Sequence, residues 1–256
     1  MLAPSEDSSV DRPRYAREIL TVADPGAPGA PMEDFLEELE AGLKEPHRDR
    51  TNHPFVHKVL AGKATLRQIG GWLLQFSLWA DQANKCFGVV YANTPDPDLR
   101  DAYLENILEE ERGEESKTAG HISLIHNALE ELGFSKEERE SAEMLPESWA
   151  FLHWAEVRMK NRSFLEAIAG GLAGERINPI VFRRLATGLR EHYHVSQTVL
   201  APFDVHASEV EVAHGSISEK VIRRYATTRF WQEKVRFAVY HTAELYYRFF
   251  NVYESY

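Results

Sequence analysis

Apolar residues three and four positions apart recur through almost the whole chain after Met32. This spacing lines one face of an α-helix, whereas a half-buried strand would alternate strictly, and no stretch alternates convincingly. Short Pro, Gly and Asn punctuation separates the periodic segments. We therefore predict an all-α bundle of roughly seven or eight core helices. The predicted segments, some of which should merge or break, are 32–44, 53–61, 66–92, 97–112, 115–133, 148–160, 163–176, 179–193, 198–214 and 217–254.

The segment before residue 32 differs from the rest of the chain. It ends in ADPGAPGAP at 23–31, which has three prolines and no periodicity, a composition typical of a flexible joint. We expect residues 1–31 to be a flexible N-terminal segment. Because the later connections are short and no internal repeat is evident, residues 32–256 should form one helical domain.

Composition narrows the range of partners. The net charge is −11, with 29 Lys and Arg against 40 Asp and Glu, which disfavours nucleic acid and anionic membranes. No apolar run is long enough to span a bilayer, and the N-terminus carries charges where a signal peptide would be apolar. Cys86, the single cysteine, excludes an internal disulfide framework. These features predict a cytoplasmic protein that acts on a small molecule.

Four predicted helices carry an ionisable residue where an apolar stripe continues inward, and an unpaired buried charge is costly. Glu111 follows apolar residues at helical spacing, His121 begins the next stripe, and Glu175 ends another just before Pro179. In FDVHASEVEVAHG, at 203–215, the ionisable residues interleaved with valines include His206, Glu209, Glu211 and His214.

A metal site would explain these residues together, although each alone has an ordinary structural explanation. Carboxylates and imidazoles without thiolates are ligands that iron and manganese prefer, and zinc takes fewer. Bundles that hold two such ions use Glu and Glu-x-x-His sets from facing helices, and Glu211 and His214 have that spacing. The predicted metal ligands, which are also the predicted catalytic residues, are Glu111, His121, Glu175, His206, Glu211 and His214.

The stretch HPFVHKVLAGKATLRQIGGWLLQF, at 53–76, resembles the opening of the haem-oxygenase-like superfamily, which includes thiaminase II and pyrroloquinoline quinone synthase. Within it, the chain is most similar to the haem-oxygenase-like diiron oxidases and oxygenases over roughly residues 40–254. Glu111 and His121 match the family's Glu and His spaced ten residues apart, and Glu175 matches its Glu before a proline. The resemblance implies a haem-oxygenase-like helical bundle.

The closing segment departs from the family's His-x3-Asp-x2-His pattern. His206 and His214 match its histidines, but Glu211 replaces the Asp and follows His206 by five residues instead of four. A regular helix would rotate Glu211 roughly 140° from His206. We therefore expect a π-bulge or a break between them, with Glu209 as the substitute ligand if Glu211 points away.

The resemblance implies an enzyme of specialised metabolism in which two Fe²⁺ ions per chain and dioxygen oxidise a small molecule, such as an amino acid or fatty acid derivative. N-oxygenation, desaturation and carbon–carbon cleavage all remain open, although Lys85 stands where nitrogen-oxygenating relatives have an additional Glu. Lys85 and Arg176 are candidates for pairing with a substrate carboxylate. An external electron donor is a further candidate partner, and the aromatic C-terminal helix would suit a homodimer.

Two other functions compete with this one. The first is a cofactor-free oxidase resembling pyrroloquinoline quinone synthase. The stretch VAHG at 212–215 also resembles the closing helix of that enzyme. The second is a non-catalytic protein that binds a small molecule in the same cavity. A thiaminase-like hydrolase is disfavoured, because Cys86 lies in the 66–92 helix and no matching nucleophile follows.

Overall fold

The computed structural model describes residues 27–207 and 209–256, with the side chains of 209–216 excepted. Regular structure in this part of the chain is helical, apart from one isolated bridge between Pro28 and Thr228. The fold class is therefore all-α, as the apolar periodicity predicts. None of the described helices combines the length and the apolar run needed to cross a bilayer.

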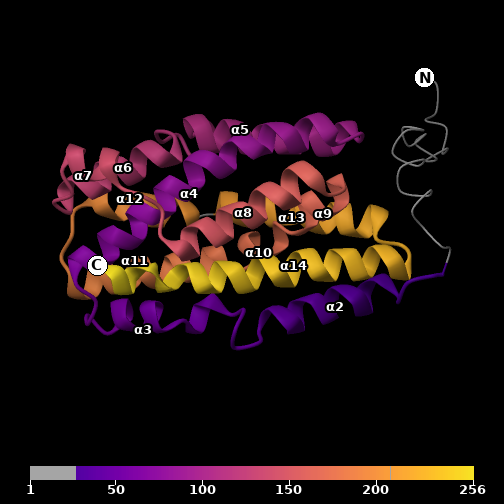
Figure 1. Ribbon diagram of the computed structural model, residues 1–256, viewed down its shortest axis with the longest axis horizontal. Coiled ribbons are helices and arrows are strands. Elements are labelled where there is room, and N and C mark those ends of the chain that lie inside the picture. Colours follow the sequence, from indigo (N-terminus) through magenta and orange to yellow (C-terminus); the bar gives the residue numbers. More distant parts are fainter. Residues whose placement is uncertain (1–26, 208) are drawn as a thin grey trace, which may run out of the picture.

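The bundle is built around three long helices, α4, α8 and α14, in which α8 packs against both others. In Figure 1, α14 runs along the length of the molecule, with α2 and α3 on one side of it and α5 and α6 on the opposite side. The helices are α2 (Met32–Leu43), η1 (Arg50–Asn52), α3 (Pro54–Leu60), α4 (Leu66–Asn93), α5 (Pro97–Arg112), α6 (His121–Glu131), α7 (Lys136–Ser141), α8 (Pro146–Asn161), α9 (Phe164–Ala169), α10 (Leu172–Glu175), α11 (Asn178–His192), α12 (Gln197–His206), α13 (Glu209–Tyr225), α14 (Arg229–Phe249) and η2 (Phe250–Ser255).

An aromatic cluster around Trp72 of α4 forms the centre of the core. The Trp72 ring is fully buried and stacks on Phe76 with ring centroids 5.5 Å apart. It also meets Phe55 of α3 at 5.6 Å and Phe250 of η2 at 5.1 Å. Because each aromatic side chain buries a large apolar area, this cluster ties both ends of the domain to α4.

Three predicted segments are interrupted. The 115–133 segment becomes helical only at His121, because Gly113 ends α5 in the left-handed conformation and a turn follows. The 217–254 segment is broken before Thr228, whose side chain caps the start of α14. The 163–176 segment is two short helices, α9 and α10.

The predicted bulge or break in the 198–214 segment takes the form of a break. Helix α12 ends at His206, where the Ala207 N–H donates to the carbonyl oxygens of Phe203 and Asp204 at 3.1 and 3.2 Å. The next helix, α13, begins at Glu209. His206 is therefore the last residue of one helix and does not share a continuous helix with Glu211.

The last residues of the predicted flexible segment are fixed on α14. The Gly29 N–H donates to the Thr227 carbonyl at 3.2 Å. The Gln232 side chain accepts from the Ala30 N–H at 2.8 Å and donates to the Ala30 carbonyl at 2.9 Å. Residues 27–31 thus pack with the helical domain, while 1–26 lie outside the described residues.

Candidate metal centre

The interior of the bundle contains a cavity of about 140 Å³. Rings of Phe76, Trp79 and Phe151 line part of it, and polar groups from several helices line the rest. A cavity of roughly 150 Å³ holds a molecule of benzene size. The space therefore suits a small organic ligand.

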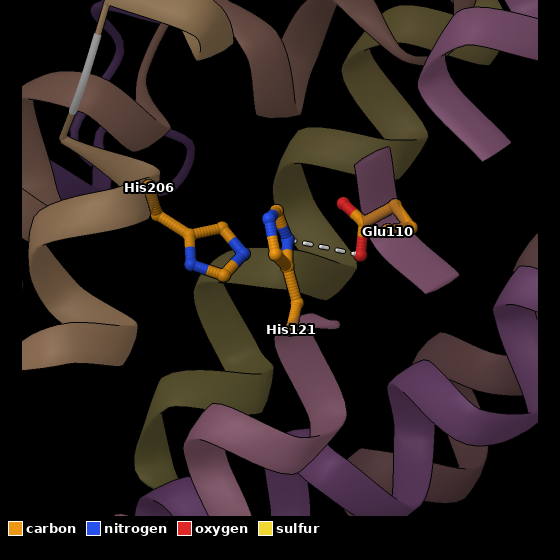
Figure 2. Close-up of side chains that lie close together, drawn as sticks. All are labelled: Glu110, His121 and His206. Carbon is orange, nitrogen blue, oxygen red and sulfur yellow. Dashed lines mark ion pairs between the residues drawn. The ribbon is translucent and has the colours of Figure 1, made fainter. Parts of the chain in front are cut away.

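Three metal-ligating side chains meet at this cavity. Glu110 of α5, His121 of α6 and His206 of α12 each offer one ligand atom, and these atoms all lie within 4.8 Å of one another. Figure 2 shows His121 between the other two. Glu110 Oε2 lies 3.2 Å from His121 Nδ1, and the two histidine rings are 4.8 Å apart. Both histidines are buried.

Hydrogen bonds on the outer side of each histidine fix which nitrogen carries the proton. His206 Nδ1 lies 2.7 Å from the Pro202 carbonyl oxygen, which can only accept. In the neutral ring, His206 Nε2 therefore carries the lone pair. His121 Nε2 lies 3.1 Å from Glu109 Oε1, a carboxylate oxygen that accepts. In the neutral ring the lone pair of His121 is therefore on Nδ1, 3.2 Å from Glu110 Oε2. Such outer bonds orient histidine ligands.

Glu109 is a buried carboxylate that supports His121 from outside the cavity. Its Oε2 accepts the backbone N–H groups of Glu115 and Ser116 at 2.7 and 3.1 Å. Burial opposes ionisation, but these bonds and the one to His121 together lower the pKa of Glu109 below its usual value. Glu109 is therefore ionised at neutral pH. No pattern in the sequence points to it, because its partners lie in an irregular turn.

Two glycines shape the turn that carries His121 to this place. Gly113 has a φ of 62°, a left-handed conformation that glycine adopts without strain. At Gly120 a Cβ atom would lie 2.3 Å from the backbone carbonyl oxygen of Glu111. The chain can therefore turn back tightly between α5 and α6 only because these two residues lack side chains.

The carboxylate beside His121 belongs to Glu110, whereas the predicted ligand Glu111 is exposed. The cavity-facing stripe of α5 is Tyr103, Asn106 and Glu110, at helical steps of three and four. The apolar residues that precede Glu111 at helical spacing in the sequence are Leu104, Ile107 and Leu108. This predicted stripe is rotated by one residue, about 100°, from the stripe that faces the cavity. Leu104 is accordingly 41% exposed.

Glu175 lines the same cavity but is not among the three clustered ligands. Burial raises the pKa of Glu175 to about 7, against the opposing effects of Ser218, Arg158 and Arg176. Its Oε2 is buried and has no hydrogen-bond partner in the described part of the chain. Side chains of the remaining predicted ligands, Glu209, Glu211 and His214, lie outside the described residues.

Lys85 and Arg176 do not line the cavity. Lys85 pairs with Asp81 at 2.9 Å on the surface. Arg176 pairs with Glu219, and its guanidinium lies 3.6 Å from Glu40. Surface carboxylates pair with both residues in this structure, and their binding of a substrate carboxylate stays a prediction.

The donor set fits iron. Two neutral imidazoles and one carboxylate, with coordination positions left open, form the ligand set of non-haem Fe²⁺ oxygenases. The sequence profile of a family described as iron-containing redox enzymes matches residues 71–247. The chain belongs to this iron-containing redox enzyme family.

Two curated relatives of this family member have names that refer to pyrroloquinoline quinone. The bifunctional coenzyme PQQ synthesis protein C/D of Methylorubrum extorquens is 27% identical over 75% of this chain and 52% of its own length. The chain thus spans about half of that relative. The pyrroloquinoline-quinone synthase of Gluconobacter oxydans is 28% identical over 65% of this chain and 70% of its own length.

Solved structures bear out the fold. A domain of unknown function with a haem-oxygenase-like fold from Shewanella denitrificans matches with a TM-score of 0.65 and 16% identity. The match covers 88% of this chain and 90% of that domain. The predicted haem-oxygenase-like fold is confirmed, and at this identity the likeness concerns the fold alone.

Proposed function

We propose that this iron-containing redox enzyme is a dioxygen-dependent oxidase or oxygenase that acts on a small organic molecule in the cavity. The observation that carries the proposal is the convergence of Glu110, His121 and His206 on a cavity of ligand size. Iron, when bound, would supply the reaction with dioxygen. The residues would hold it through one Glu110 carboxylate oxygen, His121 Nδ1 and His206 Nε2, the nitrogens that carry the lone pairs in the neutral rings.

The chain's own residues would prepare the site in two further ways. Glu109 and the Pro202 carbonyl hold the two imidazoles in the tautomers that ligation needs. The aromatic wall of Phe76, Trp79 and Phe151 offers an apolar surface to the substrate. A substrate held against this wall would keep one orientation relative to the three ligand atoms, which favours reaction.

A second Fe²⁺ is part of the proposal. Glu175 supports it, because its carboxylate lines the cavity and its buried Oε2 has no hydrogen-bond partner among the described residues. Glu211 and His214 of α13, with Glu209 as the substitute, remain the other predicted ligands. Glu111, which lies on the exposed side of α5, is no longer among them.

The test is anaerobic loading with Fe²⁺, followed by metal analysis and oxygen consumption. We expect close to two irons per chain, and a loss of bound iron in Glu110→Ala that the neighbouring surface change Glu111→Ala does not cause. Circular dichroism of both variants checks that the helices are retained. Equal iron binding by the two variants would refute the assignment of Glu110.

A metal-free oxidase is the second candidate, favoured by the names of the two curated relatives. It predicts that protein stripped of iron, zinc and manganese by a chelator still consumes oxygen with an aromatic substrate. The iron-dependent proposal predicts that stripping abolishes oxygen consumption and that Fe²⁺ alone restores it.

A further inference from the structure

Arg158 of α8 places a guanidinium in the same cavity. Its side chain is buried, with 8% exposed, and it lines the cavity together with the three metal-ligating residues. Its Nη1 donates to the Ala167 carbonyl, and its Nε has no hydrogen-bond partner among the described residues. No carboxylate of the described residues forms an ion pair with it.

The surrounding backbone leaves room for this guanidinium. A Cβ atom at Gly170 would lie 2.4 Å from Arg158 Cδ and 2.9 Å from Nε. The glycine therefore lets Arg158 occupy a place that any other side chain at 170 would contest. Tyr103 faces the same cavity from α5. Gly170 and Tyr103 thus form part of the pocket around the Arg158 guanidinium.

A buried cation without an anion is unfavourable, so this charge calls for a partner. Glu175 is the cavity carboxylate that acts on Arg158 electrostatically, but it does not form an ion pair with it and is itself a proposed iron ligand. No other carboxylate of the described side chains pairs with Arg158 either, and the molecule that enters the cavity is the candidate anion. A guanidinium binds a carboxylate with two parallel hydrogen bonds, which fixes the position and orientation of the ligand.

We infer that Arg158 is the anion-binding residue of the cavity and that the substrate is a small monocarboxylate. Its carboxylate would bind Arg158, its apolar body would contact Trp79 and Phe151, and its reacting part would face the three ligand atoms. Arg158 thereby takes the role that the sequence assigned to Lys85 and Arg176. The inference rests on the proposed function in one respect: it treats the cavity as the substrate site.

The test measures binding of benzoate and hexanoate to the metal-free full chain by isothermal titration calorimetry. We expect both to bind, and Arg158→Gln to weaken them roughly tenfold to hundredfold, since a hydrogen bond to a charged group is lost. Arg176→Gln is the matched control, because it removes a surface guanidinium and should leave affinity unchanged. Benzamide, the neutral analogue, should bind parent and variant alike.

A second variant distinguishes loss of the guanidinium from loss of the fold. Arg158→Lys keeps the charge but not the two-pronged geometry, and should bind benzoate with intermediate affinity while retaining the far-ultraviolet spectrum of the parent. Failure of both carboxylates to bind the parent, or equal binding by Arg158→Gln, overturns the inference. Tighter binding of inorganic phosphate than of either carboxylate also overturns it.

Iron binding separates this inference from the proposed function. Arg158→Gln should retain the iron content of the parent, because Arg158 is not a ligand. If the parent binds benzoate, Arg158→Gln does not, and neither protein binds iron, the proposed function is refuted and the anion site is supported. Iron bound at Glu110 without any Arg158-dependent binding of carboxylates would do the reverse.

Discussion

Changing Glu109 to Gln should weaken iron binding although Glu109 itself is not a ligand. In the parent, Oε2 holds the turn through two backbone N–H groups, and Oε1 accepts the proton of His121 Nε2. A glutamine that keeps its oxygen on the turn presents an amide N–H to His121. His121 must then accept at Nε2 and carry its proton on Nδ1, the atom beside Glu110. The lone pair needed for a metal is lost.

The expected effect follows from the loss of this orienting bond. Removing such an outer partner typically costs roughly tenfold to hundredfold in metal affinity. Anaerobic titration with Fe²⁺ measures the affinity, and ¹⁵N NMR of the histidine side chains reports the tautomer directly. Glu111→Gln is the control, since it makes the same chemical change on the exposed neighbour. Unchanged affinity and tautomer in Glu109→Gln would refute the reasoning.

Three further predictions concern other parts of the fold. Gly120→Ala should destabilise the protein by about 1–3 kcal/mol, because its Cβ would meet a backbone carbonyl at 2.3 Å, and urea unfolding would measure this. Burial, the main cause, lowers the pKa of His53 to about 4. The unfolded chain takes up this proton near pH 6.5, so stability should fall by about 3 kcal/mol between pH 6.5 and pH 4. Urea unfolding should show that His53→Gln loses this part of the pH dependence and the exposed His57→Gln retains it. Lys85→Ala and Arg176→Ala should leave steady-state oxygen consumption unchanged, and a large rise in KM in either would identify it as a substrate residue.

Much of the fold follows from the sequence because helical periodicity is a local signal. The runs that form α4, α8 and α14 combine apolar spacing with capping residues such as Thr65, which forms a capping box with Gln68. The breaks are harder to predict. Residues near Thr228 have no proline or glycine, and the helix stops there because residues 27–30 bond to the start of α14 from across the chain.

Among the three clustered side chains, the sequence identifies both histidines and misses the carboxylate by one residue. His121 and His206 lie together as expected, because each sits at the end of a helix where an apolar stripe begins or stops. Glu110 and Glu111 stand in a run of four acidic and basic residues, EEER, with no apolar residue within it or directly after it to fix the phase of the stripe. Only the packing of α5 chooses between them. Arg158 gives no sequence signal, since a surface arginine has the same pattern.

The central claim is that iron binds between Glu110, His121 and His206, and crystallography of protein loaded anaerobically with Fe²⁺ tests it directly. Anomalous scattering at the iron edge should show a peak within bonding distance of a Glu110 carboxylate oxygen, His121 Nδ1 and His206 Nε2. A peak held by Glu111 or by His121 Nε2, or no peak in the cavity of fully loaded protein, would contradict it.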